Sequence, residues 1–376
     1  MAHAILSASG AHRWLVCTPS ARIEQKFEDE TSVFAEEGTK AHAVAEKALK
    51  AYLQTGKINI ECKDAEMREM VGKYVDVCVE KINEARKASR DAVVEVEQRI
   101  NFSHLVPQGF GTGDLVMLSD EYLEVVDLKY GKGVEVSAVN NPQMRLYALG
   151  LFNEFGWMYG ARKIRMTIVQ PRIGNISTDE ISDKELVLWG DMVKKIAKIA
   201  FKGEGELKAG NHCKFCKARR TCRARADYMQ NIIRNKFKGG NELEPFEISE
   251  VLLEAQQVEN WLKDLKDWAL KQALNGEKFP WMKLVEGRSN RMIKDEAEAV
   301  KVLTEAGYGR DELFETKLIG ITKLSKLCGK DKLDKLLKGN IIKPQGKPTL
   351  VSETDKRPEY KQKIDFNTSV LDEKEQ

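Results

Sequence analysis

The sequence lacks the features of a membrane or secreted protein. No apolar run in its 376 residues approaches the roughly 20 residues that span a bilayer. The first residues, MAHAILSASGAHRWLVC, lack the basic start, the long apolar stretch and the small-residue cleavage site of a secretory signal. We therefore expect a globular, cytoplasmic protein without membrane contacts.

A strong charge bias is also missing. The formal net charge is +3, from 61 basic and 58 acidic residues, so the overall charge does not indicate a nucleic-acid-binding protein. The distribution is uneven, however. Lys208–Arg225 contains seven basic residues and no acidic one, and Lys317–Lys347 contains nine lysines and two aspartates. Such segments can follow a phosphate backbone, although most basic runs are simply solvated.

Seven cysteines in a cytoplasmic chain argue against a disulfide framework. Three of them, Cys213, Cys216 and Cys222, crowd into CKFCKARRTC. Three soft ligands leave a closed metal site incomplete, so a fourth ligand would have to come from elsewhere in the chain. The spacing alone does not choose between an iron–sulfur cluster and zinc, which could also use three cysteines with His212. Inert thiols are a further alternative, although thiols in so basic a run would be reactive.

Hydrophobic spacing predicts an α/β fold with a central mixed sheet. Helices are expected over Thr31–Gln54, Asp64–Ser89, Asn141–Phe155 and Ser182–Phe201, and strands from Val94, on both sides of Ser119-Asp120-Glu121, and over KIRMTIVQP. The order through residue 170 is helix, helix, three strands, helix, strand. KFKGGNELEPFE marks a boundary, so we expect a first domain over 1–235, a mainly helical domain over 236–342 and an extended or disordered tail over 343–376.

Ionisable residues interrupt two apolar strands in GTGDLVMLSDEYLEVVDLKYGKG. Asp114 and Asp127 come close together if the strand register pairs their ends. Two unpaired carboxylates in a half-buried sheet repel each other and are costly to desolvate, and Mg²⁺ or Mn²⁺ would relieve both effects. Lys129 lies on the same face as Asp127 and could stabilise charge on a phosphate. The simpler interpretation is a side-chain ion pair at an exposed edge.

Three further features favour a ligand site. The glycines of GTGD would leave room for a ligand to approach the backbone of Asp114. Gln143 and Tyr147 lie four residues apart on one helix face, next to the second strand. His42 could supply a nitrogen ligand, although a histidine in an Ala-rich helix could equally belong to the core.

Together these motifs resemble the RecB-like branch of the PD-(D/E)XK nucleases. The matching stretches are G-T-x-x-H-x-x-x-E (Gly38–Glu46), Gly111–Asp114, D-x-K (Asp127–Lys129) and Q-x-x-x-Y (Gln143–Tyr147). The resemblance implies a restriction-endonuclease-like core. It also implies that His42, Asp114, Asp127 and the Leu128 carbonyl hold the metal, that Lys129 is the catalytic lysine, and that Gln143 and Tyr147 support the site near the DNA.

The cysteine pattern is similar to that of AddB-type and CRISPR-adaptation nucleases, in which one N-terminal cysteine and a C-terminal C-x2-C-x5-C hold a [4Fe–4S] cluster. By this resemblance, Cys17, Cys213, Cys216 and Cys222 would bind the cluster. The basic residues around it, which are Lys214, Lys217, Arg219, Arg220 and Arg223, would grip the DNA backbone. The chain also resembles phage-encoded RecB-like exonucleases with a helical C-terminal extension, which would act in the cytoplasm of the bacterial host.

The leading hypothesis is therefore a Mg²⁺- or Mn²⁺-dependent deoxyribonuclease, an exonuclease in phage-type recombination or DNA processing. Partners would be DNA and a single-strand annealing protein or helicase. An alternative is a non-catalytic DNA-binding or recombination scaffold with a structural zinc or iron–sulfur site, and a third is a zinc hydrolase acting on another substrate. The sequence leaves exo- or endonuclease action, cleavage polarity, strand preference and oligomeric state open.

Overall fold

A computed structural model describes residues 4–28, 33–159, 162–236, 244–287, 289, 291–314, 318–342, 346, 348–352 and 357–360. Contacts between residues divide the chain into two compact units, Met1–Ala255 and Gln256–Gln376. None of the helices in the described ranges combines the length and the apolar character needed to span a bilayer.

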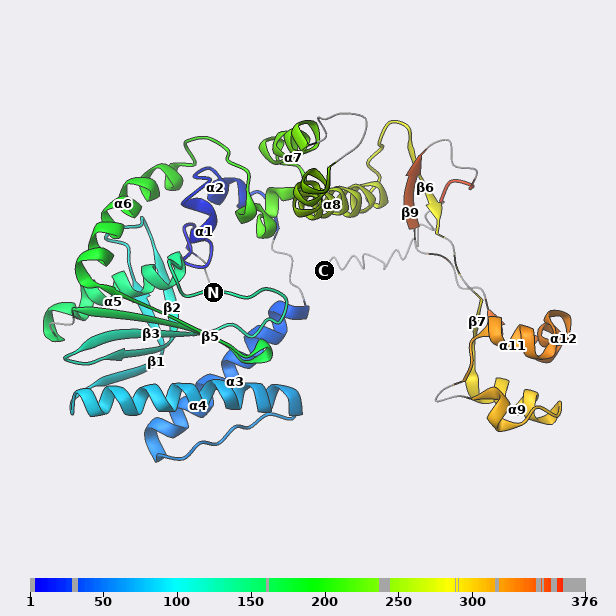
Figure 1. Ribbon diagram of the computed structural model, residues 1–376, viewed down its shortest axis with the longest axis horizontal. Helices are drawn as coiled ribbons and strands as arrows, with labels where there is room; N and C mark the ends of the chain where they lie inside the picture. The colour runs from blue at the N-terminus through cyan, green and yellow to red at the C-terminus, as the bar shows by residue number, and fades with distance from the viewer. Residues whose placement is uncertain are drawn as a thin grey trace, which may run out of the picture. The chain divides into compact units, whose positions relative to one another are not determined.

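A five-stranded sheet forms the centre of the first unit (Figure 1). Its strands, in spatial order, are β1 (Val93–Asn101), β2 (Phe110–Leu118), β3 (Tyr122–Leu128), β4 (Lys163–Gln170) and β5 (Asn175–Ser182). Only β3 and β4 run parallel, and the other neighbours are antiparallel. Helix α5 (Pro142–Tyr159) makes the crossover that a parallel pair requires.

Helices cover both faces of this sheet (Figure 1). Helices α3 (Val33–Thr55) and α4 (Ala65–Ala88) pack on one face, where Val71, Tyr74 and Leu128 belong to one buried cluster. On the other face lie α5, α6 (Asp183–Lys202) and the short helices α1 (Ala11–Trp14) and α2 (Ser20–Glu24). The fold is thus a mixed α/β sheet flanked by helices, and this part of the predicted fold class is confirmed.

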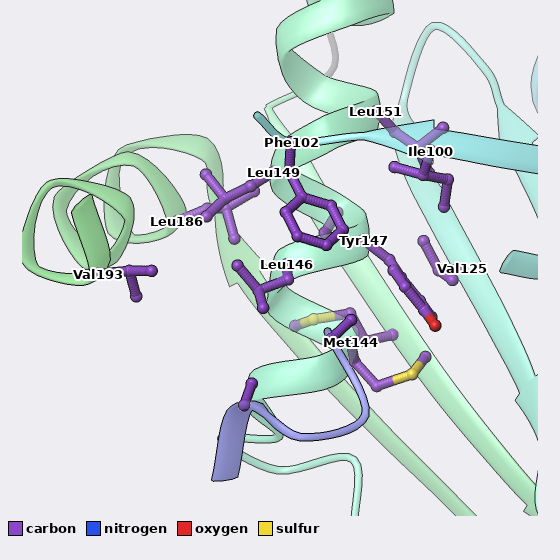
Figure 2. Close-up of a cluster of buried hydrophobic side chains, with 14 of the residues drawn as sticks. Ile100, Phe102, Val125, Met144, Leu146, Tyr147, Leu149, Leu151, Leu186 and Val193 are labelled. Carbon is purple, nitrogen blue, oxygen red and sulfur yellow. The ribbon is translucent and has the colours of Figure 1, made fainter. Parts of the chain in front are cut away.

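Figure 2 shows part of the core on the α5 face. Phe102, Leu146 and Leu149 fill the space between the sheet and helix α6. The Tyr147 side chain extends from α5 past Val125, and its hydroxyl oxygen is the end turned away from Phe102. The core therefore fixes the ring of Tyr147 and leaves its hydroxyl group for polar contacts.

The predicted order of the elements from Thr31 to residue 170 is confirmed, but other elements were missed, among them α1, α2 and β5. Helices α1 and α2 have four and five residues, too short to show helical periodicity. Strand β5 reads NISTDEIS, in which Ile176 and Ile181 are the only apolar residues. Ile176 is 57% exposed, so this edge strand lacks the apolar alternation that would identify it.

The second unit contains two small antiparallel sheets and a helical core. Strand β6 (Met282–Glu286) pairs with β9 (Pro348–Ser352), and β7 (Met292–Ile293) pairs with β8 (Ile341–Ile342). Four helices lie between β7 and β8 in the sequence and share a buried cluster. They are α9 (Glu296–Glu305), α10 (Arg310–Leu313), α11 (Ile321–Cys328) and α12 (Lys330–Leu336). Strand β9 falls within the segment predicted as an extended or disordered tail, and 361–376 of that segment lie outside the described residues.

Candidate functional site

The two aspartates of the β2–β3 hairpin lie opposite each other. Leu115 pairs with Val126 in the antiparallel register, so the next positions along the strands, Asp114 and Asp127, face one another. Asp114 is 9% exposed and Asp127 is 3% exposed. The structure therefore brings two buried carboxylates together at one end of the sheet, as the hairpin sequence predicts.

His42 approaches this pair from helix α3. Its Nδ1 atom lies 3.1 Å from Asp114 Oδ1, and the other Asp114 oxygen accepts a hydrogen bond of 2.6 Å from the Leu128 amide. Burial lowers the pKa of His42, but the hydrogen bond and the charge of Asp114 outweigh it, so the pKa lies above its ordinary value. Leu128 contacts the site through its amide, and the predicted role of its carbonyl remains a prediction.

Lys129, Gln143 and Tyr147 form a hydrogen-bonded chain around Asp127. The Lys129 ammonium lies 2.8 Å from Asp127 Oδ2 and donates a hydrogen bond of 3.0 Å to Gln143 Oε1. Gln143 Nε2 in turn donates to Asp127 Oδ1 and to the Tyr147 hydroxyl, each at 3.2 Å. Gln143 therefore contacts both the acid and the lysine of the D-x-K motif, and Tyr147, one helical turn further on, contacts Gln143.

One oxygen of Asp127 is buried beside a single cationic partner. Among the described residues, Asp127 Oδ2 has the Lys129 ammonium at 2.8 Å as its close partner. Burial raises the pKa of Asp127; Lys129 opposes this shift and Asp114 adds to it. Two buried carboxylates next to an imidazole form a donor set that suits a hard divalent cation such as Mg²⁺ or Mn²⁺.

A third carboxylate, Glu97 of β1, lies in line with these two. Val96 pairs with Leu115 and Gln98 with Gly113, which places Glu97 opposite Asp114. One ligand atom each from His42, Glu97 and Asp114 lie within 4.8 Å of one another, the one such His/Cys/Asp/Glu group among the described residues. Burial and the charge of Asp114 raise the pKa of Glu97 to about 7.

Sequence reasoning missed Glu97. Strand alternation places it with the exposed Glu95 on a solvent face, whereas the structure gives it a left-handed backbone with φ of 57°. The strand register was the one signal that could have found it, because only the register shows that Glu97 faces Asp114.

The four cysteines of the predicted cluster line a single cavity of about 200 Å³. Cys17 lies between α1 and α2, Cys213 lies in the 3₁₀ turn η2 (Asn211–Phe215), and Cys216 and Cys222 lie on either side of the 3₁₀ turn η3 (Lys217–Arg220). Glu24 of α2 joins the two segments, because it accepts hydrogen bonds from Arg13 at 3.2 Å and from the Lys217 amide at 2.9 Å. All seven cysteines are free thiols.

Among the described residues, the ligand atoms around this cavity do not form a compact group of three. Zinc bound at about 2.3 Å from each sulfur would bring the sulfurs to about 3.8 Å from one another. In the part of the chain that the structure describes, no three thiol or imidazole ligand atoms around this cavity lie within 4.8 Å of one another. Burial raises the pKa of Cys216 to about 12, so this thiol stays protonated unless a metal displaces the proton.

A family model described as "Protein of unknown function (DUF2800)" matches residues 3–358. The chain belongs to the DUF2800 family. A solved structure titled "Crystal structure of SSO0001" matches with a TM-score of 0.23 and 13% sequence identity, over 55% of this chain and 95% of that chain. At this TM-score the likeness supports no conclusion about fold or function.

The basic residues next to the cysteines of this DUF2800 chain differ in exposure. Lys214 and Arg223 are exposed, whereas Lys217, Arg219 and Arg220 are partly buried. Arg219 donates a hydrogen bond of 3.3 Å to the Cys216 carbonyl, so part of this group supports the segment itself. Lys214 lies over the exposed Phe215 ring, 5.5 Å from its centroid. The predicted DNA contacts of all five residues stay predictions.

The glycines of GTGD have a different role from the one that we expected. A Cβ atom on Gly111 would lie 2.5 Å from Tyr147 Cε1, and one on Gly113 would lie 2.9 Å from Ile100 Cδ1. The expectation that these glycines leave room for a ligand is therefore wrong, because side chains of the protein itself occupy the space. Sequence alone could not show this, since Tyr147 and Ile100 belong to other elements.

We expect Gly111→Ala to destabilise the DUF2800 chain by about 1–3 kcal/mol, because the new methyl group would displace the buried Tyr147 ring. Gly131→Ala is the control: a Cβ atom there meets nothing within 4 Å, so we expect a change within about 0.5 kcal/mol. Urea unfolding measures both free energies. Equal stability of the two variants would show that Tyr147 does not need the space.

Proposed function

We propose that this protein is a divalent-cation-dependent deoxyribonuclease of the RecB-like PD-(D/E)XK type. One observation carries the proposal. Asp114 and Asp127 face each other, buried, on neighbouring strands, and the Lys129 ammonium lies 2.8 Å from Asp127 Oδ2. An acid, a second acid and a lysine in contact are what the D…D-x-K motif needs for phosphodiester hydrolysis.

The surrounding fold supports the proposal. The order from α4 onward is helix, three antiparallel strands, crossover helix and parallel strand, the order that the resemblance implies. His42 and Gln143 come from helices packed on opposite faces of the sheet. His42 contacts Asp114, Gln143 contacts Asp127, and Tyr147 supports Gln143 through a hydrogen bond. Residues that belong to separate motifs of the family resemblance thus lie together at one site.

The chemistry divides between the cation and the side chains. Held by His42, Asp114 and Asp127, Mg²⁺ or Mn²⁺ would lower the pKa of a water molecule and polarise the scissile phosphate. The Lys129 ammonium would orient the attacking water and offset negative charge that develops on the phosphate. Gln143 keeps Lys129 and Asp127 in place through hydrogen bonds to both.

A [4Fe–4S] cluster at Cys17, Cys213, Cys216 and Cys222 is the second part of the proposal. Its support is the cavity that all four cysteines line. The cluster would be structural, because it would join the N-terminal α1–α2 segment to the segment that begins at η2. Lys214 and Arg223, exposed beside it, would contact the DNA backbone.

We further propose exonuclease action in phage-type recombination or DNA processing, with a single-strand annealing protein or a helicase as a partner and the cytoplasm as the location. These details rest on the family resemblance alone.

Digestion of end-labelled linear, circular and single-stranded DNA tests the proposal. With Mn²⁺ or Mg²⁺ we expect degradation of linear DNA, and none with EDTA or with Asp114→Asn. Asp120→Asn is the matched control, because Asp120 is an exposed aspartate of the hairpin turn. Binding of DNA without cation-dependent cleavage would instead favour the non-catalytic scaffold.

A further inference from the structure

The alternation of side chains between the two faces of the sheet changes in strand β1 at Glu97. Val96 packs in the core under α3 and α4, whereas Ile100 packs in the core on the α5 face. Residues four apart in a regular strand point to the same face, so the left-handed backbone of Glu97, with φ of 57°, changes the alternation. Such a conformation in a non-glycine residue costs about 1–2 kcal/mol. The changed alternation separates Glu97, which is partly buried, from the exposed Glu95 of the same strand.

The Glu97 carboxylate converges with two groups of the candidate metal site. Its ligand atom and those of His42 and Asp114 lie within 4.8 Å of one another, which gives one nitrogen and two oxygens. Glu97 makes no hydrogen bond or ion pair with any described residue. The nearby Lys50 ammonium lies 2.7 Å from Glu46 and is engaged there.

Three carboxylates here meet two basic side chains. Glu97, Asp114 and Asp127 occupy facing positions on three adjacent strands, and among the described residues His42 contacts Asp114 and Lys129 contacts Asp127. The buried Asp127 Oδ2 atom, whose residue is 3% exposed, has Lys129 as its close partner. Carboxylates in such proximity repel one another, and a bound cation or protonation relieves the repulsion.

From this geometry we propose that Glu97 is a ligand of the divalent cation, beside His42 and Asp114. This inference rests on the proposed metal-dependent function and adds a donor that none of the nuclease motifs contains. The cation site then includes β1 as well as the β2–β3 hairpin. The local backbone conformation of β1 serves to present this carboxylate.

A binding measurement separates this role from a structural one. Mn²⁺ is titrated calorimetrically into the full-length wild type, Glu97→Gln and Glu95→Gln, without DNA. We expect Glu97→Gln to weaken Mn²⁺ binding by more than about 100-fold, because loss of an outer contact alone costs about 10–100-fold. Glu95→Gln removes an exposed charge from the same strand and should bind Mn²⁺ as the wild type does.

Thermal unfolding of the same proteins provides the second readout. Without metal, Glu97→Gln should unfold at or above the wild-type temperature, because one repelling charge is removed. Mn²⁺ should raise the unfolding temperature of the wild type more than that of Glu97→Gln.

Three outcomes decide the matter. Wild-type Mn²⁺ affinity in Glu97→Gln would overturn the inference, whatever its unfolding temperature. If Mn²⁺ binding depends on Glu97 but the wild type cleaves no DNA, the inference holds and the nuclease proposal fails. If the wild type cleaves DNA and Glu97→Gln binds Mn²⁺ equally well, only the inference fails.

Discussion

Replacing Lys129 by alanine is expected to reduce DNA cleavage by about 10²–10³-fold while the protein still folds and still binds Mn²⁺. The ammonium lies 2.8 Å from Asp127 Oδ2, so it is placed to act on a phosphate held at the same carboxylate. Its loss removes charge stabilisation at that point without removing a cation ligand. Single-turnover cleavage of end-labelled linear DNA measures the effect, and calorimetric Mn²⁺ titration measures the binding.

Lys132→Ala is the matched control for this prediction. Lys132 is an exposed lysine three residues further along the chain, and we expect its loss to leave the cleavage rate near that of the wild type. If Lys129→Ala cleaves as fast as Lys132→Ala, Lys129 has no catalytic role. If it cleaves slowly because it no longer binds Mn²⁺, its role is to hold Asp127 in place.

The second large effect is expected from Cys213→Ser. Anaerobically purified wild-type protein should be brown and contain about four irons per chain, and the variant should lose both the colour and most of the iron. Because the cluster would close a loop of roughly two hundred residues, its loss should also destabilise the first unit by about 5 kcal/mol in chain-entropy terms. Iron analysis, visible absorbance and chemical unfolding measure these changes.

Cys62→Ser is the control for the cysteine prediction, because Cys62 is partly buried on the opposite face of the sheet and does not line the cavity. It should keep the colour, the iron and most of the stability. Zinc in place of iron in the wild type would contradict the cluster assignment. A colourless, metal-free wild type that is as stable as Cys213→Ser would contradict any metal at these cysteines.

Much of the candidate site could be predicted because its geometry depends on local rules. A short turn at Ser119-Asp120-Glu121 fixes the hairpin register, and the register places Asp114 opposite Asp127. The four-residue spacing of Gln143 and Tyr147 places both side chains on one face of α5. These parts of the site follow from periodicity, which a single sequence contains.

Other parts depend on contacts between distant segments. Glu97 enters the site through one left-handed residue, and the alternating pattern of VVEVEQ contains no sign of it. The space beside Gly111 is filled by Tyr147, thirty-six positions further along the chain in another element. The meeting of Cys17 with the Cys213–Cys222 segment likewise followed from a family pattern and could not follow from spacing.

The most direct test of the central claim is anomalous diffraction from crystals soaked in Mn²⁺, with data collected at the manganese absorption edge. The account predicts a strong anomalous peak from a Mn²⁺ ion that is bonded to carboxylate oxygens of Asp114 and Asp127 and lies close to the His42 imidazole. A structure that shows no peak at this end of the sheet, or that shows Mn²⁺ bound only elsewhere, would contradict it.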